Sequence, residues 1–486
     1  MKKHISWLVI ALVTFSLLAA SCQRTDTPSA ETSSQTTDRE TASTTAAEAS
    51  APSGTLSEEK TDRTVPNGST STRAGSATTA KTDTYEGSST MTTSNTSKTA
   101  STTKKYPVQS LEAQYQRGLL DAGNPDRLLK AMRKAQNGEV VTMVALGGSI
   151  TERYAASAQD KAYGELVAAW WRSAFPKSEL KFYNAGIASS GTHMAVHRIV
   201  DDVLPYAPDV VLVDFAVNDG IGMESSEYYE SMLRRLLNSQ NKPGLICIFF
   251  CRSDGSSTQS QQVSVAKRYN LPMLSYKDAA YYLVELGLWK WSKLSPDTVH
   301  PNNYGHQLAS DLIVRYLEEV REKLPAYDGK VDATLGTPLT PTRFEDAFKV
   351  DAANLSRQSA HCRLISMGGF VSPAKTGGKM PFSWVAQNTA EPLVFEVTGR
   401  SVQLIYRCND ANGGVATVKV NGREVGTLDA GQPWDFGNFV IAPYNAAGTD
   451  TYRVEIQMTD RASSGDVGKN GKHNVMQLYY FMIDPT

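Results

Sequence analysis

The chain has little of several features that define whole classes of protein. Its 49 basic and 50 acidic residues give a formal net charge of −1, and there is no basic stripe. A nucleic-acid-binding protein normally shows a basic excess, so we expect no nucleic-acid partner. Only five cysteines occur in 486 residues, and no Cys/His spacing is typical of a zinc site. We therefore expect no metal and no other cofactor.

A long membrane-spanning run is also missing at the N-terminus. The apolar residues 5–18 are too few to cross a bilayer comfortably. Lys2 and Lys3 precede them, and small residues lead to Cys22, as in a signal peptide. The segment resembles a bacterial lipoprotein signal, in which the cysteine becomes the lipidated first residue, although Ala19 stands where leucine is commoner. We expect residues 1–22 to be removed or lipidated in this way, which places the protein at the cell surface. An ordinary signal peptide with an incidental cysteine is the alternative.

Large apolar residues are scarce from residue 23 to residue 105, where serine, threonine and alanine dominate. Such a segment cannot bury enough surface to offset the entropy of ordering. We expect a flexible tether with a reach on the order of 50 Å. A tether of this length after a lipid anchor suits a folded part that must reach an external substrate.

Apolar runs then alternate with amphipathic segments over residues 106–330. Continuous apolar strands alternating with helices predict a parallel sheet covered on both faces, a three-layer α/β domain. Strands are expected at 140–146, 181–184, 209–216, 245–251 and 272–275, and helices at 110–120, 125–135, 163–175, 192–203, 226–237, 257–269 and 303–324. Cys247 and Cys251 lie on one expected strand about 13 Å apart, too far for a disulfide, and are interpreted as buried small hydrophobes.

Short alternating strands follow over residues 338–486. They are expected at 393–397, 402–407, 416–420, 438–442, 453–458 and 476–482, with Asn421-Gly422 as a strong hairpin signal. This pattern predicts an all-β sandwich or jelly roll. Cys362 and Cys408 could pair within it. Four aromatic residues could stack on sugar rings, although each is more often core or rim packing: Trp384, Trp434, Tyr444 and Tyr452.

Chemistry in an α/β sheet is found beyond the carboxyl ends of its strands. The first expected strand ends in Gly147-Gly148-Ser149, which leaves Ser149 at a sharp turn, either as a reactive group or as a helix cap. The second strand ends near Gly186, and the third near Asn218. A fourth segment, 297–302, begins with an Asp three residues before His300 and precedes the long helix.

These four blocks, in this order over about residues 140–324, resemble the SGNH (GDSL-type) hydrolase superfamily. The resemblance implies a flavodoxin-like sheet and ester hydrolysis through an acyl-enzyme. It implies that Ser149 is the nucleophile, His300 the base and then the acid, and Asp297 the residue that orients the histidine. The oxyanion hole would be formed by the N–H groups of Ser149 and Gly186 and the side chain of Asn218. The chain departs from the pattern at Ala216, where the family has glycine.

The chemistry is reasonable without the family name. A serine hydroxyl is a weak nucleophile until a base takes its proton, and histidine suits that task near neutral pH. The α/β-hydrolase fold is disfavoured because its Gly-x-Ser-x-Gly turn is absent here, with Thr151 at the fifth position.

The anchor, the tether and the β domain together suggest an acylated extracellular polysaccharide as the substrate. The chain resembles bacterial acetylxylan-type carbohydrate esterases, although in those the jelly roll usually comes first. We therefore expect removal of O-acetyl groups. The alternatives are a cell-wall or exopolysaccharide O-acetyltransferase, a lipase or arylesterase, and a non-catalytic glycan-binding lipoprotein.

Four further polar residues are given structural roles. Asp219 is expected to cap the loop after Asn218. His193 and His197 have a possible metal spacing but no evident third ligand, so they are interpreted as helix-surface histidines. His306 is expected to be structural, in the first turn of the last helix.

Overall fold

The structure is a computed structural model and describes residues 106–372, 379–387, 389–465 and 474–486. The expected signal peptide, Cys22 and the tether therefore lie outside the described residues. All described residues belong to one compact unit. Within these ranges, no helix combines the length and apolar character needed to cross a membrane.

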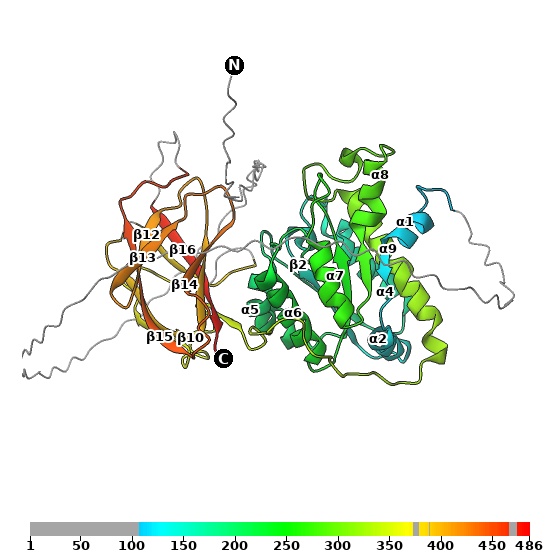
Figure 1. Cartoon of the computed structure of the whole chain (residues 1–486), viewed down its shortest axis with the longest axis horizontal. Coiled ribbons are helices and arrows are strands. Elements are labelled where there is room, and N and C mark those ends of the chain that lie inside the picture. The colour runs from blue at the N-terminus through cyan, green and yellow to red at the C-terminus, as the bar shows by residue number, and fades with distance from the viewer. Residues whose placement is uncertain (1–105, 373–378, 388, 466–473) are drawn as a thin grey trace, which may run out of the picture. The chain divides into compact units, whose positions relative to one another are not determined.

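A six-stranded sheet forms the centre of the first domain (Figure 1). Its parallel strands run in the spatial order β3-β2-β4-β5-β6, and β1 pairs antiparallel with β6 at one edge. Counted along the chain, the parallel strands follow the 2-1-3-4-5 order of flavodoxin-like folds, as expected. The strands are β1 (Leu119–Asp121), β2 (Val141–Gly147), β3 (Leu180–Gly186), β4 (Val210–Asp214), β5 (Gly244–Phe249) and β6 (Met273–Ser275).

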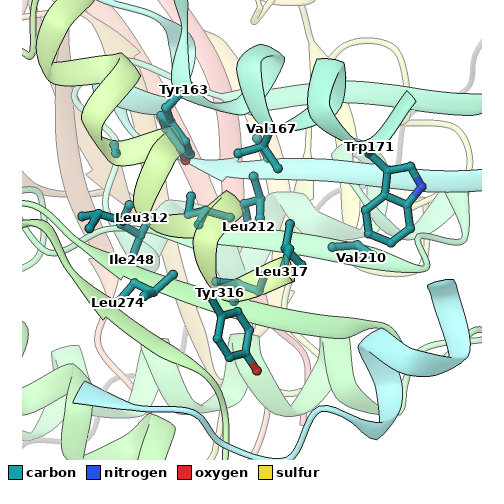
Figure 2. Packing of buried hydrophobic residues seen from close by; sticks show 14 of the residues in the cluster. Tyr163, Val167, Trp171, Val210, Leu212, Ile248, Leu274, Leu312, Tyr316 and Leu317 are labelled. Atoms are coloured by element: carbon teal, nitrogen blue, oxygen red, sulfur yellow. The ribbon is translucent and has the colours of Figure 1, made fainter. Parts of the chain in front are cut away.

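Helices cover both faces of this sheet because successive side chains of each strand point to opposite faces and both sets are apolar. In β4, Val210 and Leu212 contact one core, and Val211 and Val213 contact the other. The first core packs against α1 (Leu111–Gly118), α2 (Asp126–Gln136), α4 (Tyr163–Ala174) and α9 (Asn303–Glu322), and Figure 2 shows its α4 and α9 side chains over the strands. The second packs against α5 (Thr192–Asp202), α6 (Met223–Asn238) and α7 (Gln259–Arg268). The domain also contains two one-turn helices, α3 (Ser149–Glu152) and α8 (Tyr282–Glu285), and several short helical turns.

Two antiparallel sheets make the second domain, which confirms the expected sandwich. Their orders are β13-β12-β15-β10-β8 and β14-β11-β16-β7, with β9 paired to β16. The strands are β7 (Phe348–Val350), β8 (Cys362–Ser366), β9 (Trp384–Gln387), β10 (Leu393–Gly399), β11 (Ser401–Arg407), β12 (Val415–Val420), β13 (Arg423–Asp429), β14 (Phe436–Ala442), β15 (Asp450–Thr459) and β16 (Val475–Asp484). Asn421 and Gly422 turn between β12 and β13 with φ of 51° and 79°, as a two-residue hairpin requires.

Some details of this domain differ from expectation. The strands β7, β8 and β9 are not expected from the sequence, because they have three to five residues each and show little alternation. Cys362 and Cys408 do not pair: both are free and buried, as are Cys247 and Cys251. Trp384 is in the sandwich core at 1% exposure, where it packs edge-on against Phe395, so it cannot stack on a sugar.

Candidate active site

The structure brings Ser149, His300 and Asp297 together in a line of hydrogen bonds. His300 Nε2 lies 2.9 Å from Ser149 Oγ, and His300 Nδ1 lies 2.8 Å from Asp297 Oδ2. Ser149 is the first residue of α3, directly after β2, and Gly148 takes the cap position. The alternative that Ser149 serves as the helix cap is therefore wrong. The line joins the end of the first parallel strand to the loop before α9.

Asp297 is fixed by more than the imidazole. Its Oδ1 accepts the backbone N–H groups of Val299 and His300, both at 2.7 Å. Burial tends to raise the pKa of Asp297, but these two N–H groups and the His300 ring outweigh it and hold the pKa below its usual value. The carboxylate therefore stays charged at neutral pH and keeps His300 Nδ1 protonated. That tautomer leaves Nε2 free to accept the serine proton.

One aromatic ring packs against the imidazole, and a buried histidine supports the backbone of that residue. The Tyr154 ring lies 4.4 Å from the His300 ring, centroid to centroid. The Tyr154 carbonyl accepts from His306 Nε2 at 3.2 Å, and His306 Nδ1 accepts the Tyr163 N–H at 3.3 Å. Burial lowers the pKa of His306 to about 4, so it is neutral and supports the site from below. This is the structural role expected from the sequence.

Asn218 lies against the residue that precedes the serine. A Cβ at Gly148 would be 2.3 Å from Asn218 Oδ1, so only glycine lets the amide approach. Neither Asn218 Nδ2 nor the Ser149 N–H has a hydrogen-bond partner among the described residues. Two unused donors beside a nucleophile are what an oxyanion hole requires.

Gly186, at the end of β3, does not supply the free N–H that was expected of it. The Gly186 N–H donates to Asn184 Oδ1 at 2.9 Å, so it is not free to bind an oxyanion. Gly186 is instead required for packing, because a Cβ there would lie 2.3 Å from the Glu152 nitrogen. Three residues later, Ser189 has φ of 59°, and its N–H has no partner among the described residues. The loop that carries Ser189 begins against the end of β2, where the Ile187 N–H donates to the Gly147 carbonyl at 3.0 Å. A non-glycine residue in the left-handed region is uncommon and such residues cluster at functional sites. Sequence reasoning misses it because serine carries no signal for this conformation.

A buried arginine joins the two strand ends under the site. Arg198 on α5 is 1% exposed and donates to the carbonyls of Ala185 at 2.8 Å and Gly147 at 3.2 Å. It also pairs with Asp202 at 3.0 Å. The guanidinium thus holds the ends of β2 and β3 in register where the reactive groups project.

Two residues singled out from the sequence, Asp219 and His197, have other positions than expected, whereas His193 is half-buried. Asp219 caps α5 by accepting from the Thr192 N–H at 2.7 Å, rather than capping its own loop. His197 is 1% exposed rather than on the helix surface, and its Nδ1 lies 2.6 Å from the His193 carbonyl. Burial lowers the pKa of His193 to about 4 and that of His197 to about 3. No cluster of potential metal ligands occurs in the part of the chain that the structure describes.

A serine bonded to an oriented histidine, with free donors at its side, can carry out acyl transfer through a covalent intermediate. Together with the flavodoxin-like sheet, this defines a carboxylic ester hydrolase of the SGNH type. Residues 145–308 match the GDSL-like lipase/acylhydrolase family, which agrees with that class. Comparison with curated proteins gives no match.

Solved structures resemble the chain over both domains. One is a two-domain esterase (CEX) active on acetylated mannans, with 25% identity and a TM-score of 0.65; the match covers 76% of this chain and 98% of that one. The same esterase co-crystallised with mannopentaose has 24% identity and a TM-score of 0.66, with the same coverage. The second domain of this chain is thus part of a known two-domain esterase architecture.

Proposed function

We propose that this protein is a serine esterase that removes O-acetyl groups from an extracellular polysaccharide, with an acetylated mannan as the favoured substrate. The observation that carries the proposal is the likeness to an esterase active on acetylated mannans across both domains, not over the α/β domain alone. The hydrogen-bonded line of Ser149, His300 and Asp297 supplies the chemistry that such a substrate needs.

In the proposed reaction, Ser149 Oγ attacks the acetyl carbonyl while His300 Nε2 takes its proton. The C–O bond to the sugar then breaks, and His300 returns the proton to the leaving sugar oxygen. Water attacks the acetyl-serine with His300 again as base, which releases acetate and restores the serine. Asp297 stabilises the imidazolium at both stages.

The negative oxygen of each tetrahedral intermediate is bound by Ser149 N–H and Asn218 Nδ2. We assign the third donor to the Ser189 N–H in place of Gly186, because the Gly186 N–H is engaged with Asn184 and that of Ser189 is free. Each such donor contributes about 3–4 kcal/mol to lowering the barrier.

Of the four aromatic residues considered for sugar stacking, Trp434 is the most suitable. Trp434 is 41% exposed, and its neighbour Asp435 accepts a hydrogen bond from Ser189 in the active-site loop. Tyr444 is less suitable because the Arg343 guanidinium covers its ring at 4.3 Å, and Tyr452 packs partly against the sandwich core.

The cellular setting forms part of the proposal. The N-terminal pattern around Cys22 favours export and lipid attachment, and residues 23–105 would then separate the enzyme from the membrane. A polymer outside the cell is a substrate that such a tether could reach. Radiolabelled palmitate incorporation, lost in Cys22→Ala, tests the lipid attachment.

Acetate release tests the reaction. The wild-type protein should release acetate from acetylated glucomannan, and Ser149→Ala should abolish the release. Ser264→Ala, which removes a hydroxyl that donates to the Ser260 carbonyl on α7, should behave as wild type. Hydrolysis of an aryl acetate that depends on Ser149, without acetate release from acetylated glucomannan or xylan, would overturn the carbohydrate assignment. Labelling of the wild type but not of Ser149→Ala by a fluorophosphonate shows separately that the serine is activated.

A further inference from the structure

The loop between β3 and α5 carries the donor assigned to Ser189, yet much of its support comes from outside the α/β domain. Within that domain, the Ala188 N–H donates to Glu152 Oε2 at 2.6 Å and the Ile187 N–H donates to the Gly147 carbonyl at 3.0 Å. Both bonds hold the first half of the loop. In the second half, Ser190 is buried and its hydroxyl donates to the Ile187 carbonyl at 2.7 Å. Ser189 itself is exposed and has a left-handed backbone.

A lysine of the β domain donates hydrogen bonds to the end of β3, where this loop begins. Lys379, five residues before β9, donates from Nζ to the Gly186 carbonyl at 2.5 Å, to Asn184 Oδ1 at 3.0 Å and to the Asn184 carbonyl at 3.2 Å. One ammonium has three hydrogens, so these three acceptors use its full capacity. Because Asn184 Oδ1 also accepts the Gly186 N–H, the lysine fixes the amide that closes the turn.

An aspartate of the β domain bonds the end of the loop. Asp435, directly before β14, accepts from Ser189 Oγ at 2.5 Å. This contact acts on the residue whose backbone is strained. A carboxylate that accepts a hydrogen bond from a hydroxyl makes one of the stronger hydrogen bonds available to a protein. This bond restricts the rotation that would relax Ser189.

We infer that Lys379 and Asp435 are positioning residues for ester hydrolysis: they hold the end of β3 and the loop that follows it, residues 184–191, so that the Ser189 N–H is presented to the oxyanion. Two segments more than fifty residues apart in the chain converge on one loop, at its two ends. The β domain therefore acts on the chemical step itself, in addition to any binding of sugar. The inference needs only ester hydrolysis and does not depend on the identity of the glycan.

An aryl acetate tests this, because it has an acetyl group but no sugar. In the full chain, Asp435→Ala and Lys379→Met should each lower kcat about tenfold, which is less than complete loss of one donor, while KM stays within about twofold. Lys379→Arg, which keeps the cation, should recover most of the activity. Ser189→Ala combined with Asp435→Ala should be no worse than either alone, since both remove the same bond.

Matched controls separate positioning from stability. Asp450→Ala removes another β-domain carboxylate that accepts from a side chain, Asn445 Nδ2, and Lys330→Met removes an exposed ammonium paired with Asp328. Both should keep wild-type kcat, and all variants should unfold within a few degrees of wild type. Unchanged kcat in Asp435→Ala and Lys379→Met overturns the inference, as do kcat losses that follow a fall in Tm or that appear equally in Asp450→Ala. If the variants lose kcat on the aryl acetate as predicted but the wild-type protein releases no acetate from acetylated glycans, the result would instead count against the proposed substrate.

Discussion

Replacing Asp297 by asparagine should disable the site without changing its shape. The carboxylate has two tasks: Oδ1 accepts two backbone N–H groups at 2.7 Å, and Oδ2 accepts the His300 ring N–H at 2.8 Å. An asparagine has only one acceptor oxygen. It must face either the two backbone donors or the imidazole, and the amide N–H₂ takes the other side.

We expect the asparagine oxygen to face the two backbone N–H groups. If the amide nitrogen faced the N–H groups of Val299 and His300, two donors would lose their acceptor, at a cost of about 1–3 kcal/mol each. With the oxygen on the backbone side, the amide donates to His300 Nδ1, which must then be unprotonated. The proton moves to Nε2, where it faces Ser149 Oγ and blocks proton transfer. In a Ser-His-Asp triad, loss of the correct tautomer lowers kcat about 10⁴-fold.

We expect a similar loss here on an aryl acetate, with KM within about twofold and an unchanged melting temperature. Asp328→Asn is the matched control, because Asp328 also accepts a backbone N–H, from Lys330 at 3.0 Å, but lies beyond the far end of α9 from His300. It should keep wild-type activity. A loss of less than about tenfold for Asp297→Asn would refute the argument that Asp297 sets the tautomer.

The same geometry supports three other predictions. Asn218→Ala should lower kcat about 10²–10³-fold on aryl and glycan acetates alike, because it removes one oxyanion donor; steady-state kinetics check this, and a loss confined to KM would contradict it. Gly148→Ala should give a comparable loss although it removes no functional group, since its Cβ would lie 2.3 Å from Asn218 Oδ1 and displace the amide; wild-type kcat in a folded Gly148→Ala protein would show that Asn218 does not need its present position. Asp214→Asn should become more stable relative to wild type as pH rises. Burial raises the pKa of Asp214 to about 7, while one oxygen accepts from Thr151 Oγ1 and the other has no partner. The contribution of Asp214 to the free energy of unfolding of the wild type is thus complete below about pH 4 and is lost as the pH rises towards 7, a change of about 2–3 kcal/mol between pH 5 and pH 8. Melting curves of both proteins at pH 5 and pH 8 would refute this prediction if the difference in stability between them stayed constant.

The sequence predicts most of the α/β domain because its signals are local. Continuous apolar runs such as β2, whose seven residues are all buried, can only be covered on both faces. The hairpin at Asn421-Gly422 is equally local, since those residues suit two positive φ angles. The short strands β7 and β9 carry too few residues for a periodic pattern, so only their pairing with β16 defines them.

The line from Ser149 to Asp297 could also be predicted, because each member follows a strand end or precedes a helix in a fixed chain order. The role of Gly186 as an oxyanion donor could not be judged from its place in the chain. A glycine after a strand suggests a free N–H, and only the structure shows that Asn184 Oδ1 accepts it while a Cβ has no room. Packing and ligand approach both select glycine, and a sequence does not distinguish them.

Ser189, Lys379 and Asp435 show where sequence reasoning ends for a different reason. None of the three belongs to a spacing motif. Asp435 bonds Ser189 and Lys379 bonds Gly186, so each hydrogen bond joins segments almost two hundred residues apart or more. A left-handed serine has no compositional mark, and a lysine or an aspartate on an exposed loop is normally a solvated charge. Their importance depends on a contact that only the folded chain creates. If the β domain holds the oxyanion loop as inferred, substitutions far from the reactive serine in sequence will change kcat, and sequence motifs of the hydrolase domain alone will not predict the activity of the whole chain.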